Sequence, residues 1–289
     1  MPGASLPPAG RSRTRYVLAA AGMVLRDPLT GLDRVWERVA ERSAHPAPDT
    51  HVAPDWERRL HELVGAPWPC ADAPEFEPVW DAAQDLLRER GLARGRGTYG
   101  GWDDADPAVA RAAWCLVRHL RPARVVETGV ARGITTRVVL EALERNGEGR
   151  LWSIDLPPLL EPGLAPQLGA AVPEDCRDRW TLLQGSSRRT LPALLARLGE
   201  IDLFIHDSLH TERNVRFELS RAWASLSPGG GMLVDDVDQN RGFHAWFESE
   251  PLAQLVTGVA DDHGALLAVV RKDPSDATAR FGGSAAQET

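Results

Sequence analysis

The sequence predicts a doubly wound α/β domain, in which helices cover both faces of a mostly parallel sheet. Three observations support this fold class. From Asp106 onward, short apolar segments alternate with helical patterns, as in parallel α/β sheets. The strand candidates, such as DLFI at 202–205, are short apolar runs rather than alternating ones, as expected when both faces of a sheet are covered. Near the end of the chain, two strand-like segments are joined by DDHG, which predicts an antiparallel hairpin.

The individual elements follow from this pattern. A helix is predicted to begin at Asp106-Pro107, because an acceptor side chain at the cap followed by proline starts helices. Five strands are predicted, at Arg124–Thr128, Leu151–Asp155, Trp180–Gln184, Ile201–Ile205 and Met232–Asp235. Helices fit between them, one through Val138–Leu143 and one at Glu212–Leu226. The hairpin segments, 253–260 and 265–272, complete a seven-stranded sheet.

The N-terminal part of the chain has a different character. Residues 1–95 carry helical patterns separated by proline-rich breaks. Helices are predicted at Asp33–Arg42 and Pro54–Val64, and an apolar stripe at helical spacing runs from Phe76 to near Gly91. We therefore expect a helical cap or lid over residues 1–95, an α/β domain over 96–272 and a flexible polar tail over 273–289.

Composition excludes several classes of protein. The net charge of −8 over 289 residues argues against a nucleic-acid binder, which needs a basic face. The three cysteines, Cys70, Cys115 and Cys176, are unclustered in the sequence, and this favours a reducing cytoplasm. Arg11–Leu25 has the basic start and apolar run of a signal peptide, but no small-residue cleavage site follows it. We expect neither export nor a membrane span. The oligomeric state stays open, and a homodimer is compatible with the sequence.

The stretch FIHDSLHTER (Phe204–Arg213) concentrates proton-active side chains. His206 and His210 have the i, i+4 spacing of a zinc-binding helix, and Asp207, Ser208 and His210 are the residue types of a hydrolase triad. In the predicted sheet, however, His206 ends a strand and His210 begins a helix, so the pair does not share a helix. No G-x-S-x-G elbow surrounds Ser208. We predict structural roles for His206 and Ser208.

Polar residues and glycines also lie at the ends of the first two predicted strands, at the sheet edge where ligands bind in this fold class. Glu127, Gly129 and Gly133 form an E-x-G-x-x-x-G pattern. Glycines allow the backbone to approach a ligand, and the next helix presents free N–H groups there. Asp155 follows the second strand, where an acid suits the paired hydroxyls of a ribose. The glycine spacing differs from the G-x-G-x-x-G of dinucleotide enzymes.

The segments ETGVARG, SIDLP, QGSS, DLFIHDSLH and SPGGGMLVDDV occur in this order. Together they resemble class I S-adenosylmethionine-dependent methyltransferases, and within these a bacterial branch with D-S-x-H after the fourth strand and D-D after the fifth. The resemblance spans about Tyr99 to Lys272. It implies that the protein contacts three parts of the cofactor, namely the methionine and sugar part, the ribose hydroxyls and the adenine. The implied cofactor-binding residues are Glu127, Gly129, Val130, Gly133, Asp155, Gly185, Ser186 and Asp207.

The resemblance also implies a methyl acceptor, most simply a hydroxyl of a small molecule such as a sugar or natural product. A hydroxyl is a poor nucleophile at neutral pH, so a base, a divalent cation or both are needed. His210 is the candidate base, with Asp207 beside it in the catalytic site. Asp207, Asp235 and Asp236 lie at the ends of neighbouring strands in the resembled fold, and three carboxylates suit Mg²⁺.

Two other functions are compatible with such a sheet. One is a nicotinamide-dependent (NAD(P)) oxidoreductase, which the glycine spacing and the lack of a Tyr-x-x-x-Lys segment disfavour. The other is a nucleotide-binding relative that has lost its chemistry. The sequence does not identify the acceptor.

Overall fold

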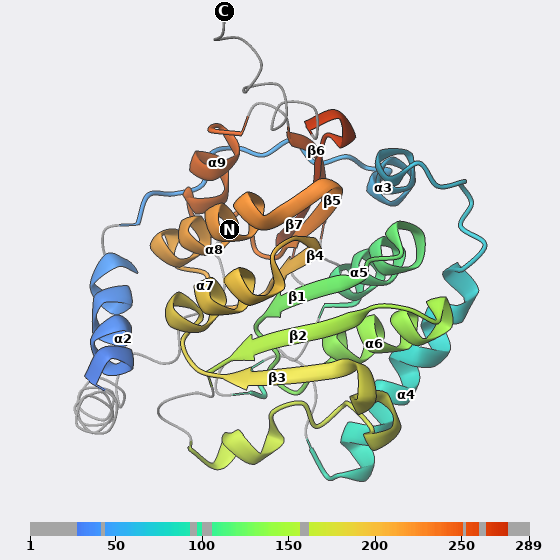
Figure 1. Cartoon of the computed structure of the whole chain (residues 1–289), viewed down its shortest axis with the longest axis horizontal. Coiled ribbons are helices and arrows are strands. Elements are labelled where there is room, and N and C mark those ends of the chain that lie inside the picture. Colours follow the sequence, from blue (N-terminus) through green and yellow to red (C-terminus); the bar gives the residue numbers. More distant parts are fainter. Residues whose placement is uncertain are drawn as a thin grey trace, which may run out of the picture.

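The computed structural model describes residues 28–41, 44–92, 97–99, 106–156, 162–250, 253–259 and 264–276. The signal-like segment Arg11–Leu25 and most of the predicted tail lie outside these ranges. The described residues contain a seven-stranded sheet with the order β3-β2-β1-β4-β5-β7-β6 (Figure 1). This arrangement confirms the predicted fold class.

The strands agree closely with the predicted ones. They are β1 (Arg124–Thr128), β2 (Arg150–Asp155), β3 (Trp180–Gln184), β4 (Ile201–His206), β5 (Leu226–Val234), β6 (Ala253–Val259) and β7 (Leu266–Lys272). The first five pair in parallel, and β7 pairs antiparallel with both β5 and β6. The main difference is β5, which begins six residues before the predicted Met232. Pro228 and the glycines after it suggest a turn, yet they continue the strand after an irregularity in its pairing with β4.

Helices cover both faces of the sheet. The described helices are α2 (Pro28–Glu41), α3 (Trp56–Val64), α4 (Phe76–Glu89), α5 (Pro107–Leu120), α6 (Ile134–Asn146), α7 (Ser187–Leu198), α8 (Glu212–Ser225) and α9 (Gly242–Phe247). One hydrophobic core lies between the sheet and α5 and α6, and a second lies between the opposite face and α7, α8 and α9 (Figure 1). Val125 and Val126 show the alternation, since one belongs to each core.

Side-chain caps set the starts of two helices. Asp106 accepts hydrogen bonds from the backbone N–H groups of Ala108 (2.7 Å) and Val109 (3.4 Å) at the start of α5. Thr211 Oγ1 accepts from the Asn214 N–H at the start of α8 (3.2 Å). The Asp106 cap is the one predicted above, and threonine is likewise a common N-cap residue. The Thr211 cap fixes where β4 gives way to α8, and so where His210 lies.

The N-terminal helices do not form a separate core. Trp56 and Leu60 of α3, and Phe76 and Val79 of α4, belong to the same core as α5 and α6. Gly258 of β6 also lies directly under the Trp56 ring. The helix predicted at Asp33–Arg42 begins earlier, at Pro28, because proline is tolerated in the first turn of a helix. The predicted division at residue 95 stays a prediction.

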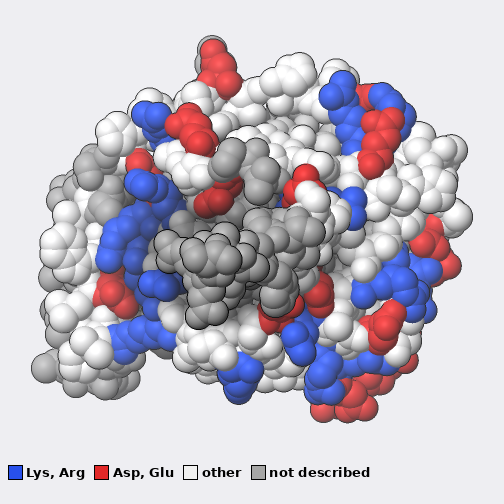
Figure 2. Space-filling model, turned by 45° about the horizontal axis from the view of Figure 1, so that its top comes forward, with Lys and Arg blue, Asp and Glu red and all other residues white. Residues whose placement is uncertain are grey.

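Among the described residues, no helix is both long and apolar enough to cross a membrane. Figure 2 shows basic side chains gathered along one side of the face it draws, with both signs mixed over the rest. The chain as a whole carries a net charge of −8.

Candidate active site

The strand order reverses between β1 and β4, and the loops after these strands are in direct contact. The Asp207 N–H donates to the Thr128 carbonyl at 2.9 Å. Gly129 has a φ of +87°, and a Cβ added there would lie 1.7 Å from the Asp207 carbonyl oxygen. The glycine was expected to let a ligand approach. In the structure, the missing side chain of Gly129 instead allows the loop after β1 to lie against the backbone that follows β4.

Asp155 at the end of β2 holds the loop after β1. Its Oδ2 accepts hydrogen bonds from the N–H groups of Val130 and Ala131, both at 2.8 Å. Ala131 has a positive φ of 47°, a conformation that these bonds help to maintain. The predicted ribose-binding carboxylate and the predicted cofactor loop are therefore joined in one rigid unit.

Glu127 lies beneath this unit, in the centre of the sheet. Its side chain is buried, and its Oε2 accepts from Ser153 Oγ of β2 (2.6 Å) and Thr136 Oγ1 of α6 (2.8 Å). Burial raises the pKa of Glu127 to about 7, although the two hydroxyl donors oppose the shift. Glu127 thus ties β1 to β2 and α6, directly under the loop that Asp155 holds.

The other predicted cofactor residues border the same edge. Gly133 is the N-cap residue of α6 and has a φ of +82°, and an added Cβ would lie 3.0 Å from Gly169 Cα. The Gly185 N–H donates to the Asp155 carbonyl at 2.9 Å, and Ser186 is the N-cap residue of α7. The loops after β1, β2 and β3 are thus linked by backbone hydrogen bonds.

Acidic side chains and one histidine converge at the ends of β4 and β5. Ligand atoms of Asp207, His210 and Asp235 all lie within 4.8 Å of one another. Asp236, the third predicted metal ligand, instead pairs with His210, whose Nδ1 lies 3.0 Å from Asp236 Oδ2. Asp236 also accepts from Gln239 Nε2. The structure therefore groups His210 with two of the three aspartates, and the third orients the histidine.

The pKa values in this cluster diverge. Burial, followed by the charge of Asp236, raises the pKa of Asp207 well above its usual range. Burial and the charge of Asp207 do the same to the pKa of Asp235. Burial by itself would lower the pKa of His210, but the negative charge of Asp236 raises it overall. Burial would likewise raise the pKa of Asp236, and the charge of His210 lowers it instead. Asp207 and Asp235 thus share the charge of one histidine, His210, with Asp236.

The strand-end histidine His206 is a structural residue, as predicted. It is fully buried, and its Nδ1 lies 2.7 Å from Glu218 Oε2 of α8. Glu218 also accepts from Thr128 Oγ1 (2.6 Å), Ser208 Oγ (2.9 Å) and Asn214 Nδ2 (2.9 Å). Sequence reasoning missed Glu218 altogether. Only its place on the inward face of a predicted helix, where an acid needs partners, could have indicated it.

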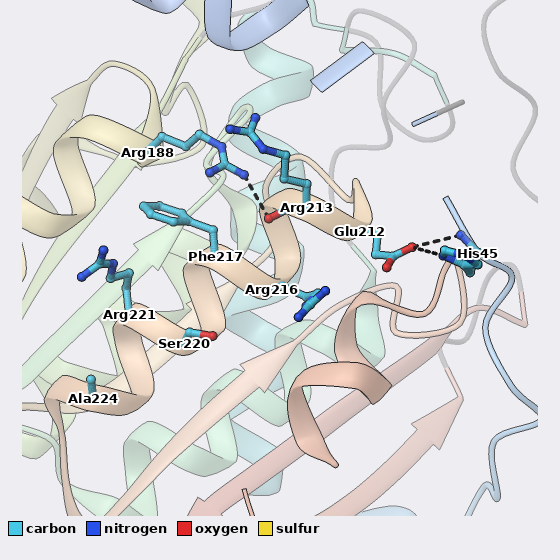
Figure 3. A pocket seen from close by; sticks show the side chains of 9 residues that line it. All are labelled: His45, Arg188, Glu212, Arg213, Arg216, Phe217, Ser220, Arg221 and Ala224. Atoms are coloured by element: carbon cyan, nitrogen blue, oxygen red, sulfur yellow. Dashed lines mark hydrogen bonds and ion pairs between the residues drawn. The ribbon is translucent and has the colours of Figure 1, made fainter. Parts of the chain in front are cut away.

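A separate groove of about 710 Å³ lies along the outer side of α8. Arg188, Arg213, Arg216 and Arg221 line it together with Phe217 (Figure 3). The guanidinium groups of Arg188 and Arg221 lie 4.7 Å and 5.8 Å from the Phe217 ring centre. None of the predicted site residues lines this groove. It is distinct from the edge where the carboxyl ends of the strands meet.

The strand order and the linked loops at the strand ends define a Rossmann-like α/β domain. Residues 126–237 match a family model described as a methyltransferase domain. This part of the chain is therefore similar to methyltransferase domains, in agreement with the sequence resemblance.

Two solved structures have a similar fold. A putative O-methyltransferase from Klebsiella pneumoniae superposes with a TM-score of 0.52 at 19% identity, covering 75% of this chain and 97% of that one. The O-methyltransferase from Bacillus cereus, in complex with S-adenosylhomocysteine (SAH), has a TM-score of 0.52 at 13% identity, with 75% and 98% covered. No curated protein matches the chain. At these identities the solved structures support the fold itself.

Proposed function

We propose that this protein is an enzyme that transfers a methyl group from S-adenosylmethionine to a hydroxyl of a small molecule. The observation that carries the proposal is the convergence of two half-sites at the switch point of a methyltransferase domain. One is the loop after β1 clamped by Asp155. The other is the cluster of Asp207, His210 and Asp235. The similar Bacillus cereus enzyme is in complex with SAH, which supports this cofactor class.

In the proposed complex, Asp155 accepts hydrogen bonds from the ribose hydroxyls while it holds the loop after β1. Gly129, Val130 and Gly133 would border the methionine and sugar part, and Gly185 and Ser186 the adenine. Glu127 would act from below, because it is buried and holds β1 and α6 in place.

The cofactor proposal is tested by calorimetry with SAH and NAD. We expect SAH to bind and NAD not to bind. Asp155→Ala should weaken SAH binding by about 10- to 100-fold, because hydrogen bonds to a charged group are worth about 1.5–3 kcal/mol. Asp202→Ala is the matched control. Asp202 Oδ2 also accepts from two backbone N–H groups, of Ala123 (3.0 Å) and Arg124 (2.9 Å), but at the amino end of β4.

SAH affinity should be unchanged in Asp202→Ala. Binding of NAD without SAH would instead support the oxidoreductase alternative. Equal SAH affinity in the wild type and Asp155→Ala would remove Asp155 from the site.

On the acceptor side, we propose His210 as the general base that removes the hydroxyl proton. Asp236 lies 3.0 Å from its Nδ1, which directs Nε2 toward Asp207, 4.0 Å away. Asp207 and Asp235 fit a divalent cation, since their ligand atoms and that of His210 all lie within 4.8 Å of one another. Burial and neighbouring carboxylates also raise the pKa of both aspartates, and a cation would offset that repulsion. A cation held there would lower the pKa of the acceptor hydroxyl.

The cation proposal is tested with Mn²⁺ as a substitute for Mg²⁺, because bound Mn²⁺ is detected by electron paramagnetic resonance without any acceptor. We expect the wild type to bind Mn²⁺ and Asp235→Asn to bind it at least about 10-fold more weakly. Asp238→Asn is the control. Asp238 lies in the same loop after β5 as Asp235, but its Oδ1 accepts a hydrogen bond from the Leu266 N–H (2.9 Å). Absence of Mn²⁺ binding by the wild type would contradict the proposal, as would equal loss in both variants.

A further inference from the structure

Two cysteines and two histidines come together on the other side of the molecule. His61 belongs to α3, Cys70 to the loop that follows it, and Cys115 and His119 to α5. Cys70 and Cys115, which are far apart in the sequence, both belong to this group. Cys115 and His119 are four residues apart on a helix, so they share one face, and that face is turned toward α3 and its loop.

Three of the four side chains, those of His61, Cys70 and His119, have ligand atoms close enough together to bind one metal ion, and Cys115 lies beside them. Cys70 Sγ lies 3.3 Å from His119 Nε2, and Cys115 Sγ lies 3.5 Å from His61 Nε2. Ligand atoms of His61, Cys70 and His119 all lie within 4.8 Å of one another. Zinc binds sulfur at about 2.3 Å and nitrogen at about 2.0–2.1 Å, so its ligand atoms in a tetrahedron lie roughly 3.3–3.8 Å apart.

The surroundings orient the ligand atoms inward. His61 Nδ1 lies 2.6 Å from the Glu57 carbonyl oxygen. As the donor of that bond, Nδ1 leaves the Nε2 lone pair free to bind a metal, an arrangement typical of histidine ligands of metals. Cys115 Sγ lies beside the ring, 3.5 Å from Nε2 and 3.9 Å from Nδ1. His61 and Cys115 are buried. The Trp68 ring lies edge-on to His61, with ring centres 4.9 Å apart, and so shields the cluster.

We propose that His61, Cys70, Cys115 and His119 bind a structural zinc ion. The donor set selects the metal, because thiolates and imidazoles favour zinc over Mg²⁺ or Ca²⁺. Two thiolates balance the charge of the ion, and such a neutral site suits a buried position. Four protein ligands leave no open coordination position, as in structural rather than catalytic zinc sites.

The location indicates what the zinc would do. In Figure 1 the arrowheads of β1, β2 and β3 point to the left, whereas α3 and α5 lie at the right. The cluster is therefore remote from the carboxyl ends of the strands and takes no part in methyl transfer. It would fasten α3 and the loop up to Asp72 onto α5, beside the ion pair of Asp72 Oδ1 with Arg118 Nη2 (3.0 Å).

The test is the metal content of the full-length protein, reconstituted with Zn²⁺ under reducing conditions and freed of unbound metal. We expect one zinc per chain in the wild type and in Cys176→Ser. Cys176 is the matched control, because its Sγ lies near Glu141 Oε1 instead (3.9 Å). Cys115→Ser and His119→Ala should lose the zinc. None of these measurements requires an acceptor or a methyl donor.

A second measurement uses the wild type alone, so it does not depend on whether the variants fold. Co²⁺ replacing the zinc should give the absorption of a tetrahedral ion with thiolate charge transfer, and its uptake should release two thiol protons. The proposal is overturned if the reconstituted wild type holds no zinc, if Co²⁺ shows no thiolate band, or if Cys70 and Cys115 form a disulfide. Equal zinc loss in Cys176→Ser would also overturn it.

Discussion

Replacing Gly129 by alanine is expected to destabilise the protein by about 4 kcal/mol or more, the range reached only by severe core defects. The added Cβ would lie 1.7 Å from the Asp207 carbonyl oxygen and 2.9 Å from the Ser208 nitrogen. These atoms belong to backbone, so no side-chain rotation can remove the overlap. The φ of +87° adds strain for any residue with a Cβ. Relief would require the loops after β1 and β4 to separate, which would break the bond from the Asp207 N–H to Thr128.

The control is Gly147→Ala at the end of α6. Gly147 also has a positive φ, of +73°, but an added Cβ would meet nothing within 4 Å. The unfolding free energy of this variant should fall by only about 1 kcal/mol, the cost of placing a residue with a Cβ at a positive φ. Urea unfolding of both variants measures the difference. Similar losses in the two would show that the contact with Asp207 does not matter and that backbone strain alone accounts for the cost.

The position of Gly129 could be predicted from the sequence, but its neighbour in the fold could not. Gly129 was correctly placed in the loop after β1, because an apolar run followed by a glycine-containing turn predicts a strand and its exit. The partner of that glycine, however, comes from β4, far along the chain. A sequence pattern specifies that the backbone comes close to something, but only the sheet order identifies Asp207 as that neighbour.

The candidate site shows the same limit. Asp155, Asp207, His210 and Asp235 were predicted, since strand ends are recognisable and parallel strands bring them to one edge. Which aspartate faces which group was not predictable, because that depends on the loop after β5. Asp236 takes a positive φ of 54° there and pairs with His210. Its sequence position next to Asp235 did not separate the two roles.

Residues that act through distant partners were missed. The cysteines of the proposed zinc site are separated by α4, the segment before α5 and much of α5 itself, so no short motif marks them. Glu218 lies on a helix and is surrounded by side chains from β1, β4 and the loop after β4. The members of each cluster can be grouped only when the packing of α3 or α8 is known.

Glu218 supports the second large expected effect. Burial alone would raise its pKa, but the hydrogen bond and charge of His206 and the other donors lower the pKa to about 2. A carboxylate with a depressed pKa stabilises the fold above its ordinary pKa of about 4.5. That contribution is lost as the pH falls toward 2. Glu218→Gln should therefore destabilise the protein by on the order of 3 kcal/mol at pH 7, since each pKa unit corresponds to about 1.4 kcal/mol.

Glu127→Gln makes the same substitution at a second buried glutamate and should show the opposite pH dependence. Burial raises the pKa of Glu127 to about 7. The stabilisation of the fold that comes from its protonated carboxyl is therefore fully present below about pH 4.5 and is lost as the pH rises through 7. The unfolding free energy of Glu127→Gln relative to that of the wild type should therefore increase by on the order of 3 kcal/mol between pH 4.5 and pH 8.

Urea unfolding across pH 4.5–8 distinguishes the two glutamates. The difference between Glu218→Gln and the wild type should stay constant over this range, because both relevant pKa values lie at or below its lower end. The difference between Glu127→Gln and the wild type should change steadily and level off above pH 7. Parallel curves for Glu127→Gln and the wild type would mean that Glu127 is ionised throughout. The hydroxyls of Ser153 and Thr136 would then outweigh its burial.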